Sequence, residues 1–391
     1  MSSNRWPSQI VRGCALSLLC IVLSSPASAA KPLPLEKIPH SLELTDEYPD
    51  SWVFAHDFNF AAIVDGKVAI LDAAADTRPY KGHIDAGQFA SFLAAKTRPE
   101  LYAAQTFLSR RTYGERVDTI TIFDRKTLLP QAEIILPPKR MQVVTHKNSF
   151  QLTPDENWAF VMNFTPRASV TVVDMIGRKV LSEIEVPGCN FVFPTGKRSF
   201  SSLCTDGALA TFTLKGDGSL ESSTRTEPFI DIDTDPLYAK NAVIDGITYF
   251  PSFRGRVQPI DFRGNTPRLL PAWSLLDDEA AAEKWAPGGW QVIDGNDGGR
   301  LYVLMHKDAS EGSHKHGGTE VWSYEAVTGK RLARIPLERW GVSVAVTRGD
   351  TNLLVVTNEN MELDVYDALT GKWLRTLHLN MAANPMVVSS Q

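Results

Sequence analysis

Residues 321–332 read VWSYEAVTGKRL and residues 364–374 read DVYDALTGKWL, so this part of the chain nearly repeats itself. The two stretches share Tyr, an acid, Ala, an aliphatic residue, Thr, Gly, Lys and Leu at an offset of 42 residues. Each is a run of β-branched or aromatic residues that ends in an acid, followed by a Thr-Gly turn and a second apolar alternation. That is the pattern of a β-hairpin. Hairpins that recur roughly every 40 to 50 residues predict a β-propeller, whose blades bury their hydrophobic faces against neighbouring blades.

The same hairpin can be traced through the rest of the chain. The residue that ends the third strand of each unit, usually an acid, stands at Asp72, Asp124, Asp174, Leu214, Asp261, Glu325 and Asp367. The spacings lie between 40 and 64 residues. Seven four-stranded units account for the chain from about residue 40 to its C-terminus. We therefore predict an all-β fold, a single seven-bladed propeller of four-stranded antiparallel blades.

Two regions depart from a simple strand pattern. Residues 88–95 and 101–108 are alanine-rich and favour helix by propensity, but Pro99 between them and the phase of the blades predict two strands. The spacing of 64 residues before Glu325 requires insertions. Residues 274–285 predict one short helix before the sixth blade, with Ser274 as its N-cap, and residues 307–318 predict a polar loop.

The first blade shows only three clear strands, so its inner strand must come from elsewhere. Residues 41–44 and residues 385–389 are both suitable. We expect the C-terminal segment, because clasping the two ends of a propeller removes its open sheet edges.

The N-terminus has the pattern of an export signal. Arg5 and Arg12 precede an apolar stretch at residues 14–24, and PASAA follows at residues 26–30. This predicts a Sec-type signal peptide over residues 1–29, a propeller domain over residues 30–391, and a location in the periplasm. The apolar stretch is too short to cross a bilayer, and no later segment resembles a membrane span.

Export would also change the charge and the cysteine content. Without Arg5 and Arg12, 38 of the 40 basic residues remain against 45 acidic ones, so the formal net charge moves from −5 to −7. An acidic surface disfavours nucleic acid and anionic membranes as partners. Of the four cysteines only Cys189 and Cys204 remain. A hairpin that turns at Gly196 places them opposite each other, which predicts a disulfide in the oxidising periplasm.

Few residues suggest chemistry. The histidines at positions 306, 314 and 316 could share a metal, but their surroundings are rich in Gly, Ser and Lys, so we predict a solvated loop and no metal site. The alternating acids of residues 231–235 suggest the solvated face of an edge strand. No nucleophile elbow, zinc-helix motif, glycine-rich phosphate loop or haem attachment site occurs in the sequence. We therefore expect no catalytic residue in this chain.

Three stretches are more specific than a general propeller repeat. They are residues 127–134 (TLLPQAEI), the segment 188–207 with its two cysteines, and residues 285–291 (WAPGGWQ). In these stretches the chain resembles the heavy subunit of methylamine dehydrogenase and, less closely, that of aromatic amine dehydrogenase. The resemblance covers essentially the whole exported chain.

The resemblance implies a periplasmic α2β2 heterotetramer of two seven-bladed heavy chains and two light chains. In that family the light subunit makes tryptophan tryptophylquinone from its own tryptophans. The enzyme oxidises primary amines to aldehyde and ammonia, and passes electrons to a cupredoxin such as amicyanin. A heavy chain then needs no cofactor or catalytic residue of its own, because the quinone in the partner carries the chemistry.

The resemblance also singles out Phe60. Within DFNFAA at residues 57–62, this position matches the phenylalanine that lines the amine channel of the methylamine enzymes. An ordinary apolar residue between two strands is an equally good interpretation of Phe60.

Two other functions remain open. The chain could be a periplasmic propeller that only binds or scaffolds, because a fold does not by itself determine a function. A self-contained enzyme with pyrroloquinoline quinone is a weaker alternative, since the adjacent cysteines and metal-ligand acids of that group are missing. A neighbouring light-chain gene would favour the amine dehydrogenase.

Overall fold

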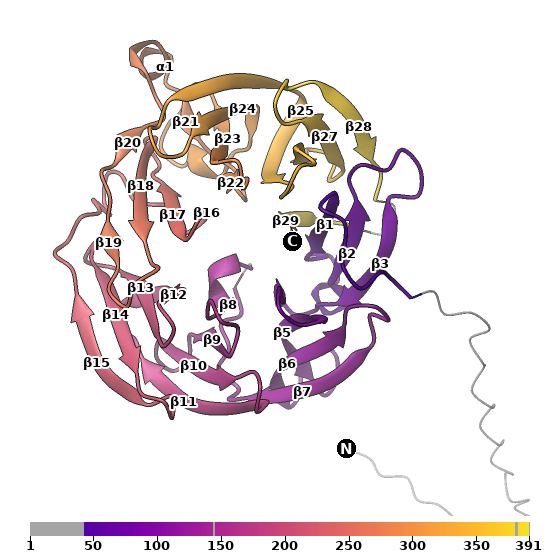
Figure 1. Ribbon diagram of the computed structural model, residues 1–391, viewed down its shortest axis with the longest axis vertical. Coiled ribbons are helices and arrows are strands. Elements are labelled where there is room, and N and C mark those ends of the chain that lie inside the picture. The colour runs from indigo at the N-terminus through magenta and orange to yellow at the C-terminus, as the bar shows by residue number, and fades with distance from the viewer. Residues whose placement is uncertain (1–42, 144, 380–381, 391) are drawn as a thin grey trace, which may run out of the picture. The chain divides into compact units, whose positions relative to one another are not determined.

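A computed structural model describes residues 43–143, 145–379 and 382–390, and these residues belong to one compact unit. The signal peptide predicted for residues 1–29 lies outside the described residues. The sheets stand around a central channel, and in each sheet the strands follow one another outward from it, which is the architecture of a β-propeller (Figure 1). The predicted all-β propeller of four-stranded antiparallel blades is confirmed, except for the number of separate sheets.

The first three sheets each contain four antiparallel strands. In the first, the order is β29 (Pro385–Ser390), β1 (Trp52–Asp57), β2 (Lys67–Asp72) and β3 (Tyr80–Asp85). In the second it is β4 (Ser91–Ala94), β5 (Glu100–Leu108), β6 (Arg116–Asp124) and β7 (Pro130–Leu136). In the third it is β8 (Phe150–Leu152), β9 (Trp158–Asn163), β10 (Ser169–Asp174) and β11 (Lys179–Glu185). The two strands predicted around Pro99 are therefore confirmed as β4 and β5.

The fourth and fifth sheets follow the same plan. The fourth contains β12 (Cys189–Thr195), β13 (Ser199–Cys204), β14 (Leu209–Leu214) and β15 (Leu220–Arg225). The fifth contains β16 (Ala242–Ile244), β17 (Ile247–Pro251), β18 (Arg256–Asp261), β19 (Arg268–Leu269) and β20 (Trp273–Ser274). Both β19 and β20 pair with β18, so the outer strand of this blade is interrupted.

The last sheet is twice as wide. It contains β21 (Ala286–Pro287), β22 (Ile293–Gly295), β23 (Arg300–His306), β24 (Gly318–Glu325), β25 (Arg331–Val346), β26 (Leu353–Asn358), β27 (Leu363–Asp367) and β28 (Trp373–Leu377). Residues 331–336 of β25 pair with β24, whereas residues 341–346 pair with β26. The outer strand of one half is thus continuous with the inner strand of the next.

The predicted count of seven separate blades is wrong. The described strands form five blade-sized sheets and one eight-stranded sheet. The difference arises at residues 337–340, where the chain stays extended within β25 and joins the two halves of the sheet. No Gly-Pro or Asn-Gly turn signal interrupts this stretch to end the strand.

Burial explains why the middle strands are so apolar. Strand β10 is buried at all positions but its last, because neighbouring sheets cover both of its faces, whereas the outer strand β15 is exposed throughout. Between the first and last sheets, Leu71 and Val53 pack against Val355 and Val365. Each fully buried aliphatic side chain of this kind stabilises the fold by about 1.5–3 kcal/mol.

The C-terminal segment closes the ring, as predicted. Strand β29 pairs antiparallel with β1, with Val388 opposite Ala55 and Ser390 opposite Val53. The first sheet is therefore built from both ends of the described chain. Its innermost strand lies beside the central channel (Figure 1).

Short helices occur only in connections among the described residues. The predicted helical insertion is present as α1 (Asp278–Ala282), but Asp277 is its N-cap, since its side chain accepts a 2.9 Å hydrogen bond from the backbone of Ala280. The predicted N-cap, Ser274, belongs to β20 instead. Single 3₁₀ turns are η1 (Ile63–Asp65), η2 (Lys147–Ser149) and η3 (Ser313–Lys315).

Candidate functional site

Phe60 lies in the connection between β1 and β2, and 42% of it is exposed. Its backbone N–H donates to Asn384 Oδ1 at 3.0 Å. The buried carboxylate of Asp57 holds the same region, because it accepts backbone N–H groups from Asn59, Ala383 and Asn384 at 2.7–3.0 Å. The connection that carries Phe60 is thus tied to the segment that leads into β29.

Aromatic side chains continue inward from Phe60. Its ring lies 5.8 Å from the ring of Phe58 and 6.4 Å from that of Phe89, and Phe58 lies 6.1 Å from Trp290. We call Phe60, Phe89, Phe58 and Trp290 the aromatic row. Phe58 is almost fully buried, so the row leads from an exposed ring to the interior. Such surfaces bind apolar groups, and their ring faces attract ammonium ions.

Three basic groups border the inner part of this region. Burial lowers the pKa of His56, whose ring lies 4.9 Å from that of Phe58, to about 4. Burial lowers the pKa of Lys240, whose ammonium lies 4.6 Å from the Trp290 ring, to about 8. Burial and the charge of Lys240 lower the pKa of His146 to about 4. Both imidazoles are therefore neutral at pH 7.

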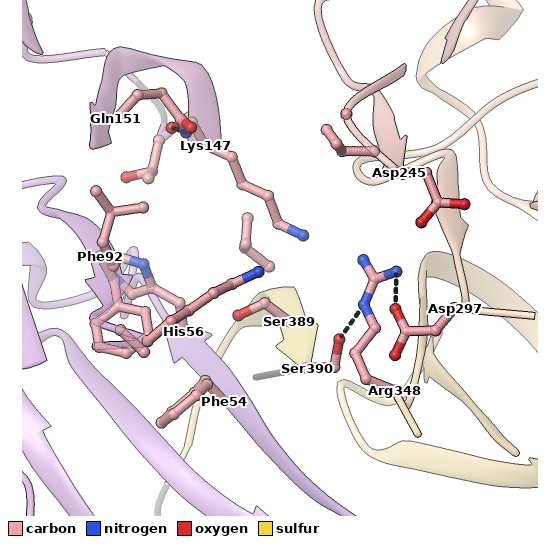
Figure 2. A pocket seen from close by; sticks show the side chains of 17 residues that line it. Phe54, His56, Phe92, Lys147, Gln151, Asp245, Asp297, Arg348, Ser389 and Ser390 are labelled. Atoms are coloured by element: carbon pink, nitrogen blue, oxygen red, sulfur yellow. Dashed lines mark hydrogen bonds and ion pairs between the residues drawn. The ribbon is translucent and has the colours of Figure 1, made fainter. Parts of the chain in front are cut away.

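A cavity of about 640 Å³ lies where the inner strands of the sheets converge (Figure 2). Lys147 and Arg348 extend into it from opposite sides, and β29 forms part of its wall (Figure 2). Its volume is typical of pockets that hold small molecules. No motif predicted this cavity, because its lining comes from separate segments between residues 54 and 390.

The structure contains the predicted disulfide between Cys189 and Cys204. The two residues are direct cross-strand partners in β12 and β13, and the hairpin turns at Gly196, whose φ is +61°. Glycine adopts this left-handed conformation without steric cost, which explains the tight turn. The disulfide fastens the hairpin of β12 and β13.

Two of the three histidines lie near each other, since the rings of His306 and His316 are 6.4 Å apart. His306 is buried at the end of β23, where Nε2 lies 2.9 Å from Ser313 Oγ. His314 stacks on Phe253 at 4.2 Å between ring centroids, and His316 is exposed. Within the described ranges, no group of three His, Cys, Asp or Glu side chains is arranged to hold a metal ion. The predicted solvated loop is correct only in part.

The acids that end third strands shape turns. Asp124 Oδ1 accepts backbone N–H groups from Lys126 and Thr127 at 3.1 and 2.7 Å, and Asp367 does the same for the turn after β27. The N–H of Thr127 lowers the pKa of Asp124 accordingly. Asp231 caps a turn in the same way, so the edge strand expected at residues 231–235 is wrong. These carboxylates are turn caps.

No helix among the described residues is both long and apolar enough to cross a membrane.

Comparisons with known proteins point to one family over most of the chain. A family model described as methylamine dehydrogenase heavy chain (MADH) matches residues 52–390. The chain is 30% identical over 344 residues to the methylamine dehydrogenase heavy chain of Methylorubrum extorquens, covering 86% of this chain and 82% of that relative.

A second relative is the methylamine dehydrogenase heavy chain of Paracoccus versutus, 26% identical over 377 residues, or 95% of this chain and 82% of that relative. Among solved structures, dihydro-heme d1 dehydrogenase NirN in complex with DHE superposes with a TM-score of 0.53 at 14% identity, covering 86% of this chain and 66% of that one. This last likeness concerns the fold alone. Because the family model spans the propeller from β1 to β29, the chain belongs to the methylamine dehydrogenase heavy chain family.

Proposed function

We propose that this chain is the heavy subunit of a periplasmic quinoprotein amine dehydrogenase. It is exported by the signal peptide of residues 1–29 and pairs with a light subunit in an α2β2 heterotetramer. The single observation that carries this proposal is the family match over residues 52–390. The heavy-chain name of the relatives implies a light chain as partner.

The light subunit would hold tryptophan tryptophylquinone, which supplies the two-electron oxidation of a primary amine. With one water the amine yields an aldehyde and ammonia, and two electrons pass singly to a cupredoxin such as amicyanin. This chain binds no cofactor in that scheme. Its contribution is to bind the light subunit, shape the path of the amine and exclude water from it.

The exposed part of the aromatic row supports this role. Phe60 offers apolar surface in the connection between β1 and β2, and the half-buried ring of Phe89 lies 6.4 Å from its ring. Aromatic side chains of this kind are enriched in the buried centres of protein interfaces. We assign Phe60 to the wall of the amine channel, where its ring limits the length of the alkyl group.

Co-expression tests the proposal. The chain should copurify with its light subunit when both are produced with the maturation genes, and the complex should show a quinone absorption band and reduce an artificial dye with methylamine. The control is the same chain produced alone, which should oxidise no amine. Dye reduction by the chain alone, or failure of any light subunit to bind it, would show that the subunit assignment is wrong.

A further inference from the structure

The connection between β3 and β4 carries a second phenylalanine beside Phe60. Phe89 lies in the turn after β3 and is half-buried. Its ring lies 6.4 Å from the ring of Phe60, a separation at which two aromatic rings contact each other. A ring from a second connection therefore lies next to the ring that we assign to the amine channel.

The backbone of this turn is strained. Gln88 and Phe89 both have a φ of +52°. Residues with large side chains rarely adopt this left-handed conformation, and here two consecutive ones do. Such a conformation persists only where the surrounding structure holds it, and it occurs preferentially at ligand-binding sites. The contacts that hold this turn consequently determine where the Phe89 ring lies.

The guanidinium of Arg140 supplies those contacts. Arg140 lies in the connection between β7 and β8 and is only 3% exposed. Its Nη2 donates to the backbone oxygen of Gln88 at 2.9 Å, and its Nη1 donates to that of Phe89 at 3.0 Å. A third acceptor, Thr106 Oγ1, lies 3.0 Å from Nη2. Because a guanidinium is planar and its N–H groups point in fixed directions, it specifies the positions of both carbonyl groups.

Arg140 makes these hydrogen bonds in its charged form. Burial lowers the pKa of its guanidinium to about 10, and the charge of Asp118 opposes this change. The side chain is therefore positively charged at pH 7. Hydrogen bonds from a charged donor are stronger than those between neutral groups, so both carbonyl groups of the strained turn are held firmly.

The turn is also fastened to the connection that carries Phe60. The backbone N–H of Gln88 donates to the backbone oxygen of Ile63 at 2.6 Å. A Cβ atom at Gly87 would lie 2.5 Å from the backbone oxygen of Val64, so only glycine permits this close approach. The two connections thus form one hydrogen-bonded unit, and a shift of the turn changes the space between the two rings.

We propose that Phe89 is a second specificity-determining residue of the amine channel and that Arg140 is its positioning residue. Phe60 and Phe89 together form the apolar constriction that the alkyl group of the amine passes. Arg140 acts through the backbone of Phe89 and does not contact the amine. This inference rests on the proposed amine dehydrogenase function and adds two residues to it.

Steady-state kinetics of the assembled enzyme with methylamine and butylamine test the role of Phe89. Phe89→Ala should shift the relative kcat/KM about tenfold towards butylamine, because an apolar wall discriminates between alkyl chains by their length. The combined variant Phe60→Ala/Phe89→Ala should shift it by less than the product of the two single shifts. Neighbouring rings that form one constriction are coupled, since removing either ring already opens it.

Phe253→Ala is the matched control. Phe253 is a half-buried phenylalanine in the connection between β17 and β18, and its ring packs on Tyr238 and His314 instead. Its replacement should leave the preference between the two amines as in the wild type.

Arg140→Lys tests the positioning role. Lysine keeps the charge but lacks the planar fork that holds both carbonyl groups. The preference should shift about threefold or more towards butylamine in the wild-type background, and it should not shift further in the Phe89→Ala background. A purely structural arginine would lower the melting temperature without this dependence on Phe89. Thr106→Val removes one acceptor of the guanidinium with little change of shape, so it should cause a smaller shift and tests the role if Arg140→Lys does not fold.

Two results would overturn the proposal. An unchanged preference in Phe89→Ala would remove Phe89 from the channel. A preference that is unchanged in Arg140→Lys, or in Thr106→Val where the former does not fold, would remove the positioning role, as would an equal shift in the Phe89→Ala background. Both results are measured on a complex that contains a light subunit and oxidises methylamine. Failure to form that complex is a different outcome, which would overturn the subunit assignment and this inference with it.

Discussion

The half-exposed ring of Phe60 is the part of the structure that we assign to substrate choice. If it limits the amine channel, Phe60→Ala should shift the relative kcat/KM between a short and a longer alkylamine tenfold or more, because an apolar pocket discriminates by about 1–3 kcal/mol per methylene. Steady-state kinetics of the assembled enzyme with both amines measures the shift.

Phe164 offers a matched control. It is 45% exposed in the connection between β9 and β10, which corresponds to the connection that carries Phe60. Phe164→Ala should leave amine preference unchanged. Both variants should lose less stability than the roughly 3–5 kcal/mol typical of a buried phenylalanine. A core-sized loss in Phe60→Ala with unaltered preference would make Phe60 a packing residue.

His56 makes stability depend on pH. Its folded pKa of about 4 lies below its ordinary value of 6.5, so between these values the unfolded chain binds a proton that the folded chain does not. Above pH 6.5 protonation of this group does not reduce the free energy of unfolding. As the pH falls towards 4, it reduces the free energy of unfolding by up to about 3 kcal/mol. His56→Phe should flatten this part of the stability curve, measured by denaturant unfolding from pH 7 to pH 4.

The comparison is between His56→Phe and the wild type over the same pH range. Equal slopes for His56→Phe and the wild type would mean that other groups control the acid response.

Single residues also show the limit of sequence reasoning. Cys189 and Cys204 could be paired from the sequence, because a short turn between two strands determines which residues are opposite. That Lys147 and Arg348 face each other could not be predicted from the sequence, because it depends on how distant sheets are placed around the channel. Phe60 was located correctly, but its role still rests on the family.

At the scale of secondary structure, the β12–β13 hairpin provides the test of the disulfide. Closing a loop of 15 residues stabilises the fold by about 3 kcal/mol in the chain-entropy model. The double variant Cys189→Ser/Cys204→Ser should therefore melt at a lower temperature than the oxidised protein. It should melt at the same temperature with or without a reducing agent.

Thiol titration of the denatured protein tests whether Cys189 and Cys204 form the disulfide. The exported wild-type chain should contain no reactive thiol. Two reactive thiols per exported chain would mean that the disulfide is absent in solution.

Strand positions were largely predictable and strand ends were not. The two strands predicted at residues 88–95 and 101–108 are β4 and β5, and β4 is shorter than the predicted run. The N-cap of α1 was misplaced at Ser274, because Asp277 can cap equally well and only the path of β20 decides between them. Local propensity identifies elements, whereas tertiary pairing determines where they begin and end.

At the scale of the whole molecule, β29 holds the ends of the chain together. Val388 is fully buried between the first and last sheets, while its neighbour Ser389 is partly exposed on the other side of the strand. Val388→Asp should destabilise the protein by about 3 kcal/mol or more, because it buries an unpaired charge. Denaturant unfolding of the exported chain measures this.

Ser389→Asp is the matched control on the same strand, and it should cost much less. If both variants unfolded at the same denaturant concentration, β29 would not be part of the closed ring in solution.

For the molecule as a whole, the repeat pattern predicted the wrong number of separate sheets. Spacing between acids at strand ends locates each four-stranded unit correctly, yet it carries no information about whether the chain bends between units. That depends on residues 337–340, which stay extended. A repeat period therefore locates the ends of third strands more reliably than it predicts the number of separate sheets.

The continuity of β25 has a consequence for circular permutation. At the other junctions between sheets the chain passes through connections outside the strands, where new termini would interrupt few backbone hydrogen bonds. New termini within β25 would instead cut a strand whose first part, residues 331–336, pairs with β24 and whose last part, residues 341–346, pairs with β26. Each sheet from the second to the fifth is thus a contiguous module, whereas the two halves of the last sheet can only be inserted, deleted or transplanted as a pair and the first sheet needs both ends of the described chain.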